Sequence, residues 1–152
     1  MNYNNINIDK QQLIEIANKI LLKQPFSIFL GTKIVDFAIG SVILETPIKE
    51  NYLQQNGFVH GGVLSYAADN ALTFAGGSVL GIDVLTLEFK INFLRPAVGK
   101  SLLAYGNAIY SSKRQAACRC DIYAVHEDDK KLCAIAQGTI ITIDNQNNNR
   151  MS

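Results

Sequence analysis

Between Glu50 and Asp83 the chain carries a single formal charge, the carboxylate of Asp69. Solvated protein surfaces are normally rich in charged side chains, so a long stretch with one charge must lie largely inside the folded chain. After Gly61 and Gly62 the apolar residues recur with the period of a helix, at 63, 64, 67, 68, 71, 72 and 75. The pattern predicts a buried central helix. Its Asp69 carboxylate must therefore bind a polar or charged partner, be neutralised by a raised pKa, or take part in the function of the protein.

The other face of this helix is polar but almost uncharged. It is formed by Gly62, Ser65, Tyr66, Asp69, Asn70, Thr73 and Gly76. A solvated helix face usually carries Lys and Glu, so we expect this stripe to meet another protein surface or a ligand.

An amphipathic pattern near the amino terminus predicts a second helix over about residues 9–24. Asp9 is its expected N-cap, and Pro25 lies just beyond its end. We expect Phe26 and Phe29 to lie in a short irregular segment and to anchor it to the core.

Strand patterns cover most of the remaining chain. Residues 31–47 are rich in β-branched residues and predict a strand bent or broken around Gly40. Four further segments alternate in strand fashion between turn residues: 84–94, 101–110, 115–126 and 131–144. This order of elements predicts an α+β fold in which a meandering antiparallel sheet packs on the central helix. We expect one domain over residues 1–144 and a disordered polar tail over 145–152.

Charge and cysteine usage narrow the class of function. A net charge of +1 without a run of Lys and Arg argues against a nucleic-acid partner. Cys118, Cys120 and Cys133 have neither disulfide-framework nor metal-ligand spacing, which indicates unpaired thiols in a reducing cytoplasm and no metal site. The apolar stretch 61–82 is long enough to cross a bilayer, but Asp69 and its polar neighbours argue against a membrane span.

Two segments together resemble the phenylacetate-degradation-type (PaaI-like) acyl-CoA thioesterases. The first is Gly57-Phe58-Val59-His60-Gly61-Gly62 with Asp69 nine positions after the histidine, and the second runs over residues 85–97. The resemblance covers about residues 30–143. It implies the hotdog fold, in which an antiparallel sheet wraps a long helix, here with an extra N-terminal helix. It also implies hydrolysis of an acyl-CoA to a free acid and CoA, without a metal or redox cofactor.

The chemistry of thioester hydrolysis gives these residues roles. Negative charge develops on the carbonyl oxygen, and N–H groups at a helix N-terminus are fixed donors for it. Resemblance to the family points to the Gly61 amide as the principal donor, with Gly62 beside it. It implies that Asp69 is either a general base toward water or a nucleophile, and the sequence leaves both routes open. It further implies that Asp69 works on the loop of a neighbouring subunit, so the site would need a homodimer or a dimer of dimers.

Five other residues near these positions are candidates for the site. Family members usually have an asparagine six positions before the histidine, where this chain has Gln54. Glutamine donates the same N–H from a longer arm, so Gln54 is the candidate second donor, with Gln55 and Asn56 as alternatives. Thr86 matches a position where relatives place a small hydroxyl residue near the attacking water. We expect His60 to position the loop and not to act as a base.

The substrate needs basic and apolar partners. The phosphates of coenzyme A need cations, and four basic residues lie near predicted strand ends or turns: Lys90, Arg95, Lys113 and Arg114. Three aromatic residues are candidates to line a pocket for an aromatic or medium acyl chain, although packing in the core is their commoner role: Tyr66, Phe74 and Phe89.

Two other functions stay open. A hotdog domain could bind acyl-CoA or a related lipid without turnover, an alternative that the presence of Gln54 keeps alive. A hydratase or dehydratase that uses His60 and Asp69 is the weaker alternative, because those enzymes arrange their acid–base pair differently.

Overall fold

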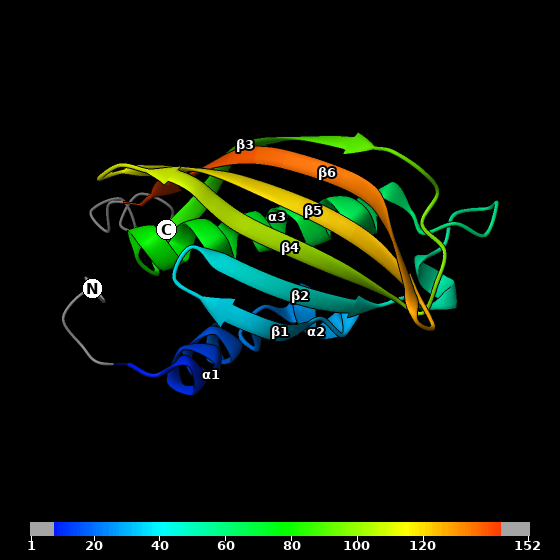
Figure 1. Ribbon diagram of the computed structural model, residues 1–152, viewed down its shortest axis with the longest axis horizontal. Coiled ribbons are helices and arrows are strands. Elements are labelled where there is room, and N and C mark those ends of the chain that lie inside the picture. The colour runs from blue at the N-terminus through cyan, green and yellow to red at the C-terminus, as the bar shows by residue number, and fades with distance from the viewer. Residues whose placement is uncertain (1–7, 144–152) are drawn as a thin grey trace, which may run out of the picture.

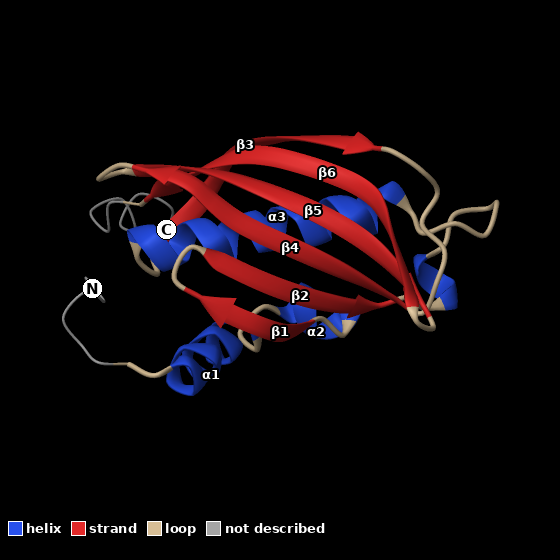
Figure 2. Ribbon diagram, in the orientation of Figure 1, coloured by secondary structure: helices blue, strands red, loops and turns tan. Residues whose placement is uncertain are grey.

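Residues 8–143 are described by a computed structural model, in which an antiparallel sheet curves around one long helix (Figures 1 and 2). The helices are α1 (Lys10–Leu21), α2 (Pro25–Leu30), α3 (Gly61–Leu80) and a short 3-10 turn, η2 (Glu50–Tyr52). The strands are β1 (Lys33–Ala38), β2 (Ser41–Pro47), β3 (Val84–Phe93), β4 (Ser101–Ser111), β5 (Gln115–His126) and β6 (Asp129–Thr142). The strand order across the sheet is β1-β2-β4-β5-β6-β3. The predicted fold, a sheet wrapped around a central helix, is confirmed.

The long helix α3 is the one predicted from the charge-free stretch. Its apolar positions are buried against the sheet, among them Leu64, Ala68 and Leu72, which have at most 3% of their surface exposed. Small residues allow the helix to sit close to the strands. A Cβ built on Gly76 would lie 2.6 Å from Cγ1 of Ile140 on β6, so glycine is needed at this crossing.

The sheet departs from the predicted meander at β3. Strands β4, β5 and β6 follow one another in hairpins, but β3 pairs with β6 at the far edge and not with β4, its successor in the chain. The segment after β3 passes the ends of the other strands, where the Lys100 N–H donates to the Val125 carbonyl at 2.7 Å. Periodicity identifies the faces of a strand but not its neighbours, so the sequence pattern could not reveal this pairing.

The predicted break in the first strand is confirmed, whereas the last strand differs from its prediction. The break around Gly40 is confirmed as a hairpin turn between β1 and β2, with Gly40 at φ 85°. Strand β6 begins at Asp129 and not at 131, because Glu127 adopts φ 53° and reverses the chain in a tight turn. The strand ends at Thr142 and not at Asp144. The ends of the predicted domain and the tail at 145–152 lie outside the described residues.

Helix α1 has the predicted N-cap but is shorter than 9–24. The Gln12 N–H donates to Oδ1 of Asp9 at 2.8 Å, and the Asp9 N–H donates to the Gln12 side chain at 3.0 Å. The helix ends at Leu21. Gln24 is extended, as a residue before proline tends to be, and Pro25 opens α2 at a first helical position.

The expectation that Phe26 and Phe29 anchor an irregular segment to the core is wrong. Both lie on α2 and are 58% and 61% exposed. Helical geometry turns Ser27 and Leu30 inward instead, and both are buried. The two rings stack on each other with centroids 6.4 Å apart.

The three cysteines are free and buried, which agrees with core thiols. Burial raises the pKa of the Cys118 thiol to about 11 and also raises the pKa of the Cys133 thiol. Of the helices within residues 8–143, none is both long enough and apolar enough to cross a membrane.

Candidate active site

His60 is the N-cap residue of α3. Its Nδ1 accepts a hydrogen bond from the Gly62 N–H at 2.9 Å, so the ring proton lies on Nε2. The His60 N–H in turn donates to the Tyr52 carbonyl at 2.8 Å. These two bonds fix the turn that carries Gly61 and Gly62, which is the positioning role expected for His60.

The Gly61 amide is the available donor of the first helical turn. The N–H groups of Gly62 and Val63 are both taken by His60, by its side chain and by its carbonyl oxygen respectively. Leu64 also approaches that carbonyl, at 3.4 Å. Within residues 8–143 the Gly61 N–H has no acceptor, and it stands at the positive end of the α3 dipole. Such a group can stabilise an oxyanion.

Gly61 lines a hollow of about 400 Å³ with Gln54, Phe58, Leu64, Phe93 and Arg95. Gln54 sits in a tight turn, in which its side-chain oxygen accepts from the Asn56 N–H at 2.6 Å. That contact leaves its NH₂ group unengaged within the described part of the chain. Gln55 and Asn56 are exposed and do not line the hollow. Among the three candidates for the second donor, Gln54 is therefore the one beside Gly61.

Asp69 lies eight residues after Gly61, which is about 12 Å along the helix axis and about 80° around it. Its half-buried carboxylate accepts a hydrogen bond from the Thr86 hydroxyl on β3, with 2.7 Å between the oxygens. It does not line the hollow that contains Gly61. Within one subunit, Asp69 and Gly61 therefore do not share this hollow.

Thr73 lies beside this carboxylate and was not among the site residues predicted from the sequence. Its hydroxyl donates to the Asp69 carbonyl oxygen at 2.8 Å and lies 2.9 Å from the Thr86 hydroxyl. Each hydroxyl has one proton, and both protons are donated to Asp69, so the contact between the two hydroxyls is at most a bond that shares one of these protons. The four-residue spacing from Asp69, one helical turn, was the signal that could have identified it.

Tyr66 and Asn70 of the polar stripe on α3 meet the N-terminal part of the same chain. The Tyr66 hydroxyl donates to Oγ of Ser27 at 2.7 Å and lies 3.0 Å from Oγ1 of Thr32. Asn70 donates to the Tyr66 oxygen at 3.1 Å. For Tyr66 and Asn70, the surface that the stripe was expected to meet is formed by α2 and Thr32 of the same chain, whereas Gly76 packs on Ile140 of β6.

The four candidate cations lie in three places. Arg95 lines the hollow with Gly61 and Gln54. Lys90 lines a separate hollow with residues of β5 and β6. Lys113 and Arg114 lie in the turn between β4 and β5, at the opposite end of the sheet from the segment after β3 (Figure 1). The structure therefore brings only Arg95, of these four, to the predicted oxyanion donors.

Comparison with known proteins places this arrangement in a family. The model of the thioesterase superfamily matches residues 56–132, which include Gly61, Asp69 and Thr86. A "putative esterase" of Saccharolobus solfataricus is 36% identical over 69 residues, a match that spans 45% of this chain and 49% of that protein.

Solved structures show the same fold over most of the chain. A thioesterase family protein from Silicibacter pomeroyi is 27% identical, with a TM-score of 0.80 over 89% of this chain and 98% of that chain. A mutant of the phenylacetic acid degradation protein PaaI from Thermus thermophilus is 27% identical, with a TM-score of 0.70 over 79% of this chain and 100% of that chain. The resemblance to PaaI-like proteins, drawn from residues 57–62, Asp69 and 85–97, is thereby confirmed. The chain belongs to the thioesterase superfamily and has its hotdog fold.

Proposed function

We propose that this protein is a thioesterase that hydrolyses an acyl-CoA to a free acid and coenzyme A, at a site shared by two subunits. One observation carries the proposal. The Gly61 N–H, which has no acceptor within residues 8–143, and the Thr86-bound carboxylate of Asp69 are each equipped for thioester chemistry. Their residues are nevertheless about 12 Å apart along the axis of one helix, and Asp69 does not line the hollow of Gly61. A thioester carbonyl can contact both only if Asp69 comes from the partner subunit.

In the proposed reaction the carbonyl oxygen accepts hydrogen bonds from the Gly61 N–H and the Gln54 NH₂ group. These donors stabilise the negative charge that forms when the carbonyl carbon is attacked. Asp69 of the partner subunit either removes a proton from the attacking water or attacks the carbon itself to form a mixed anhydride, which water then hydrolyses. In both routes the C–S bond breaks, and the CoA thiolate leaves and takes up a proton. Neither route requires a metal or a redox cofactor.

Strand β3 is the proposed surface for the second subunit. It is an edge strand of the sheet, so one side of its backbone has no strand partner within residues 8–143. Leu85 and Leu87, on either side of Thr86, are 56% and 61% exposed. An exposed edge with apolar side chains favours pairing with another copy. A homodimer formed there, alone or as half of a dimer of dimers, would bring two copies of Thr86 and Asp69 close to the interface.

Arg95 is the proposed first contact for the coenzyme A phosphates. It shares the hollow of Gly61 and Gln54 and also lines the adjoining hollow beside His126 and Lys131. A guanidinium pairs strongly with phosphate oxygens. The cytoplasm, where acyl-CoA is available, is the proposed location.

Thiol release from a panel of short, medium, long and aromatic acyl-CoAs tests the function. Replacing Asp69 with asparagine keeps its shape and removes its basicity, and we expect kcat to fall about 10²- to 10⁴-fold. Asp128→Asn, in the exposed turn between β5 and β6, is the matched control and should retain wild-type activity. Circular dichroism and sedimentation should show an unchanged fold and assembly. Acyl-CoA binding without release would favour the non-catalytic alternative, and release that survives in Asp69→Asn would show that the site is wrong.

A subunit-mixing experiment tests whether the site is shared. Gly61→Pro removes the free N–H at a first helical position, where proline is tolerated, and His60 before it has a compatible extended backbone. Each of Gly61→Pro and Asp69→Asn should be inactive alone. An equal mixture, unfolded and refolded together, should regain about a quarter of wild-type activity, because half of the dimers then contain one intact site. No recovery in verified mixed dimers would place both residues of a site in one subunit.

A further inference from the structure

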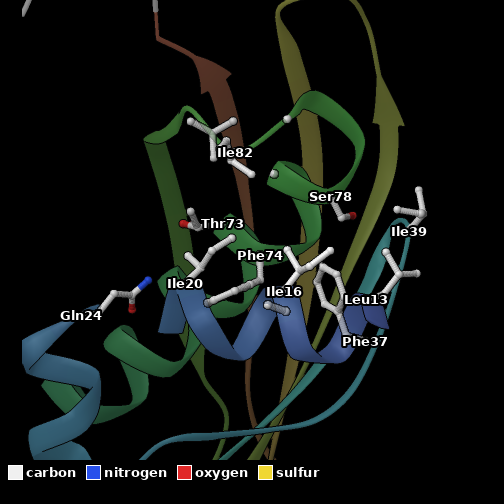
Figure 3. A pocket seen from close by; sticks show the side chains of 14 residues that line it. Leu13, Ile16, Ile20, Gln24, Phe37, Ile39, Thr73, Phe74, Ser78 and Ile82 are labelled. Carbon is white, nitrogen blue, oxygen red and sulfur yellow. The ribbon is translucent and has the colours of Figure 1, made fainter. Parts of the chain in front are cut away.

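An apolar cavity of about 160 Å³ lies between α1 and the C-terminal half of α3 (Figure 3). Its walls include Ile16 and Ile20 of α1, Phe37 of β1, Phe74 of α3 and Ile82, which follows α3. Ile20 and Ile82 are 36% and 61% exposed, so the cavity is open to solvent beside them. An open cavity with apolar walls loses contact with water when a hydrocarbon group fills it.

The cavity begins next to the proposed catalytic carboxylate. Thr73 lines it, and the Thr73 hydroxyl lies 2.9 Å from the Thr86 hydroxyl, which donates to Asp69 at 2.7 Å. A carbonyl carbon attacked at Asp69 would thus have its alkyl side at the Thr73 end of the cavity. Phe74, one of the aromatic residues that the sequence offered for a ligand pocket, lies on the cavity wall.

Most polar side-chain groups on the walls are already engaged, and the NH₂ group of Gln24 is the one for which the described residues offer no acceptor. The Ser78 hydroxyl donates to the Ala75 carbonyl at 2.7 Å and accepts from the Gly40 N–H at 2.7 Å. The side-chain oxygen of Gln24 accepts from the Ser27 hydroxyl at 2.6 Å. None of the residues that line the cavity is charged. The neutral Gln24 NH₂ group is thus the one side-chain donor left for a substituent. A carboxylated acyl group would therefore leave water without gaining a charged partner, whereas a plain hydrocarbon group has no hydrogen bonds with water to lose.

We propose that this cavity holds the acyl group of the substrate and selects an unsubstituted hydrocarbon of about six carbons or a phenyl ring. The inference rests on the proposed thioesterase function. The volume of the cavity suits a group of this size, because a cavity of about 150 Å³ lined by Leu, Ile and Phe accommodates benzene. The cavity belongs to the subunit that supplies Asp69, while Gly61, Gln54 and Arg95 belong to the other subunit. The acyl group and the coenzyme A of one substrate molecule are thus held by different subunits.

A chain-length series tests the pocket by activity. Each buried methylene should raise kcat/KM about fourfold, so the ratio of hexanoyl-CoA to acetyl-CoA should be on the order of 100-fold and should level off in longer chains. Ile20→Trp fills the cavity and should bring this ratio close to one. Leu22→Trp places the same ring at the end of the same helix, where Leu22 is 65% exposed and does not line the cavity, and it should keep the wild-type ratio. An unchanged ratio in folded Ile20→Trp would overturn the proposal.

A binding measurement on the wild-type protein separates this proposal from the proposed function. S-hexyl-coenzyme A is a thioether that lacks the thioester carbonyl group, so it can bind but its C–S bond cannot be hydrolysed by the proposed reaction. In methyl NMR, saturable shifts are expected for four isoleucines of the cavity and not for Ile135, which lines the hollow of Lys90. The four are Ile16, Ile20, Ile39 and Ile82. Turnover of acyl-CoA without these shifts would overturn the pocket and leave the thioesterase standing. Shifts without turnover of any acyl-CoA would support the pocket and refute the enzyme.

Discussion

Replacing Thr86 with valine removes the hydroxyl that holds Asp69 and leaves the side chain almost the same shape. The bond from the Thr86 hydroxyl to Oδ1 of Asp69 measures 2.7 Å, a length typical of hydrogen bonds to an ionised acceptor. Such bonds contribute about 1.5–3 kcal/mol. A tenfold change in rate corresponds to 1.36 kcal/mol, so we expect kcat to fall about 10- to 150-fold. Water can replace the lost donor in the unliganded state, because the carboxylate is half-buried, so the free energy of unfolding should change by less than about 1 kcal/mol.

The assay is thiol release measured for Thr86→Val, Thr86→Ser and Asp69→Asn, and for the double variant Asp69→Asn/Thr86→Val. Serine keeps the hydroxyl, so Thr86→Ser should retain kcat within about threefold of the wild type. The double variant should be about as active as Asp69→Asn, because the hydroxyl acts through the carboxylate. If valine leaves kcat at the wild-type value, or lowers the activity of Asp69→Asn by the same factor as that of the wild type, the hydroxyl does not position Asp69 for catalysis.

Three further predictions concern stability. Gly76→Ala puts a methyl group 2.6 Å from the fully buried Ile140, so overpacking should lower the free energy of unfolding by about 1–3 kcal/mol; an unchanged urea midpoint would contradict this contact. Burial raises the pKa of the Cys118 thiol from 9.0 to about 11, so stability should fall as the pH rises from 9 toward 11, because the unfolded chain loses this proton first; Cys118→Ala should weaken that dependence in urea titrations. The hydrogen bond from Lys10 lowers the pKa of the Asp36 carboxyl below 3.8. That stabilisation is present above pH 3.8 and is lost at lower pH, so Asp36→Asn should reduce the acid sensitivity of the thermal midpoint, and an identical pH profile would refute the assignment.

The central helix was predicted by local sequence pattern alone. One charge between Glu50 and Asp83 and a helical period after Gly62 predicted a buried helix, and α3 runs over Gly61–Leu80. The strand over 115–126 matches β5 residue for residue. These features follow from side-chain polarity along the chain, which the sequence contains directly.

In the loop before α3, local sequence pattern could not identify the residue that lies beside Gly61. Gln54, Gln55 and Asn56 are equally able to donate a hydrogen bond, and their order in the chain does not say which one faces Gly61. The choice depends on how the turn over residues 54–58 packs against the segment after β3, where the Val59 N–H donates to the Ala97 carbonyl at 3.0 Å. The exposure of Phe26 and Phe29 has the same origin, because a short helix presented them outward in place of Ser27 and Leu30.

Sequence alone therefore determined most of the elements, the buried helix and the residues whose chemistry suits a thioester, but not the short helix α2. Tertiary structure decided the edge position of β3, the hydrogen bond between Thr86 and Asp69 and the cavity under α1. The physical reason is the separation along the chain of the residues that each feature joins. Polarity and periodicity act between residues that are close in the chain, whereas a strand pairing, a carboxylate partner and a cavity each join residues that only the folded chain brings together.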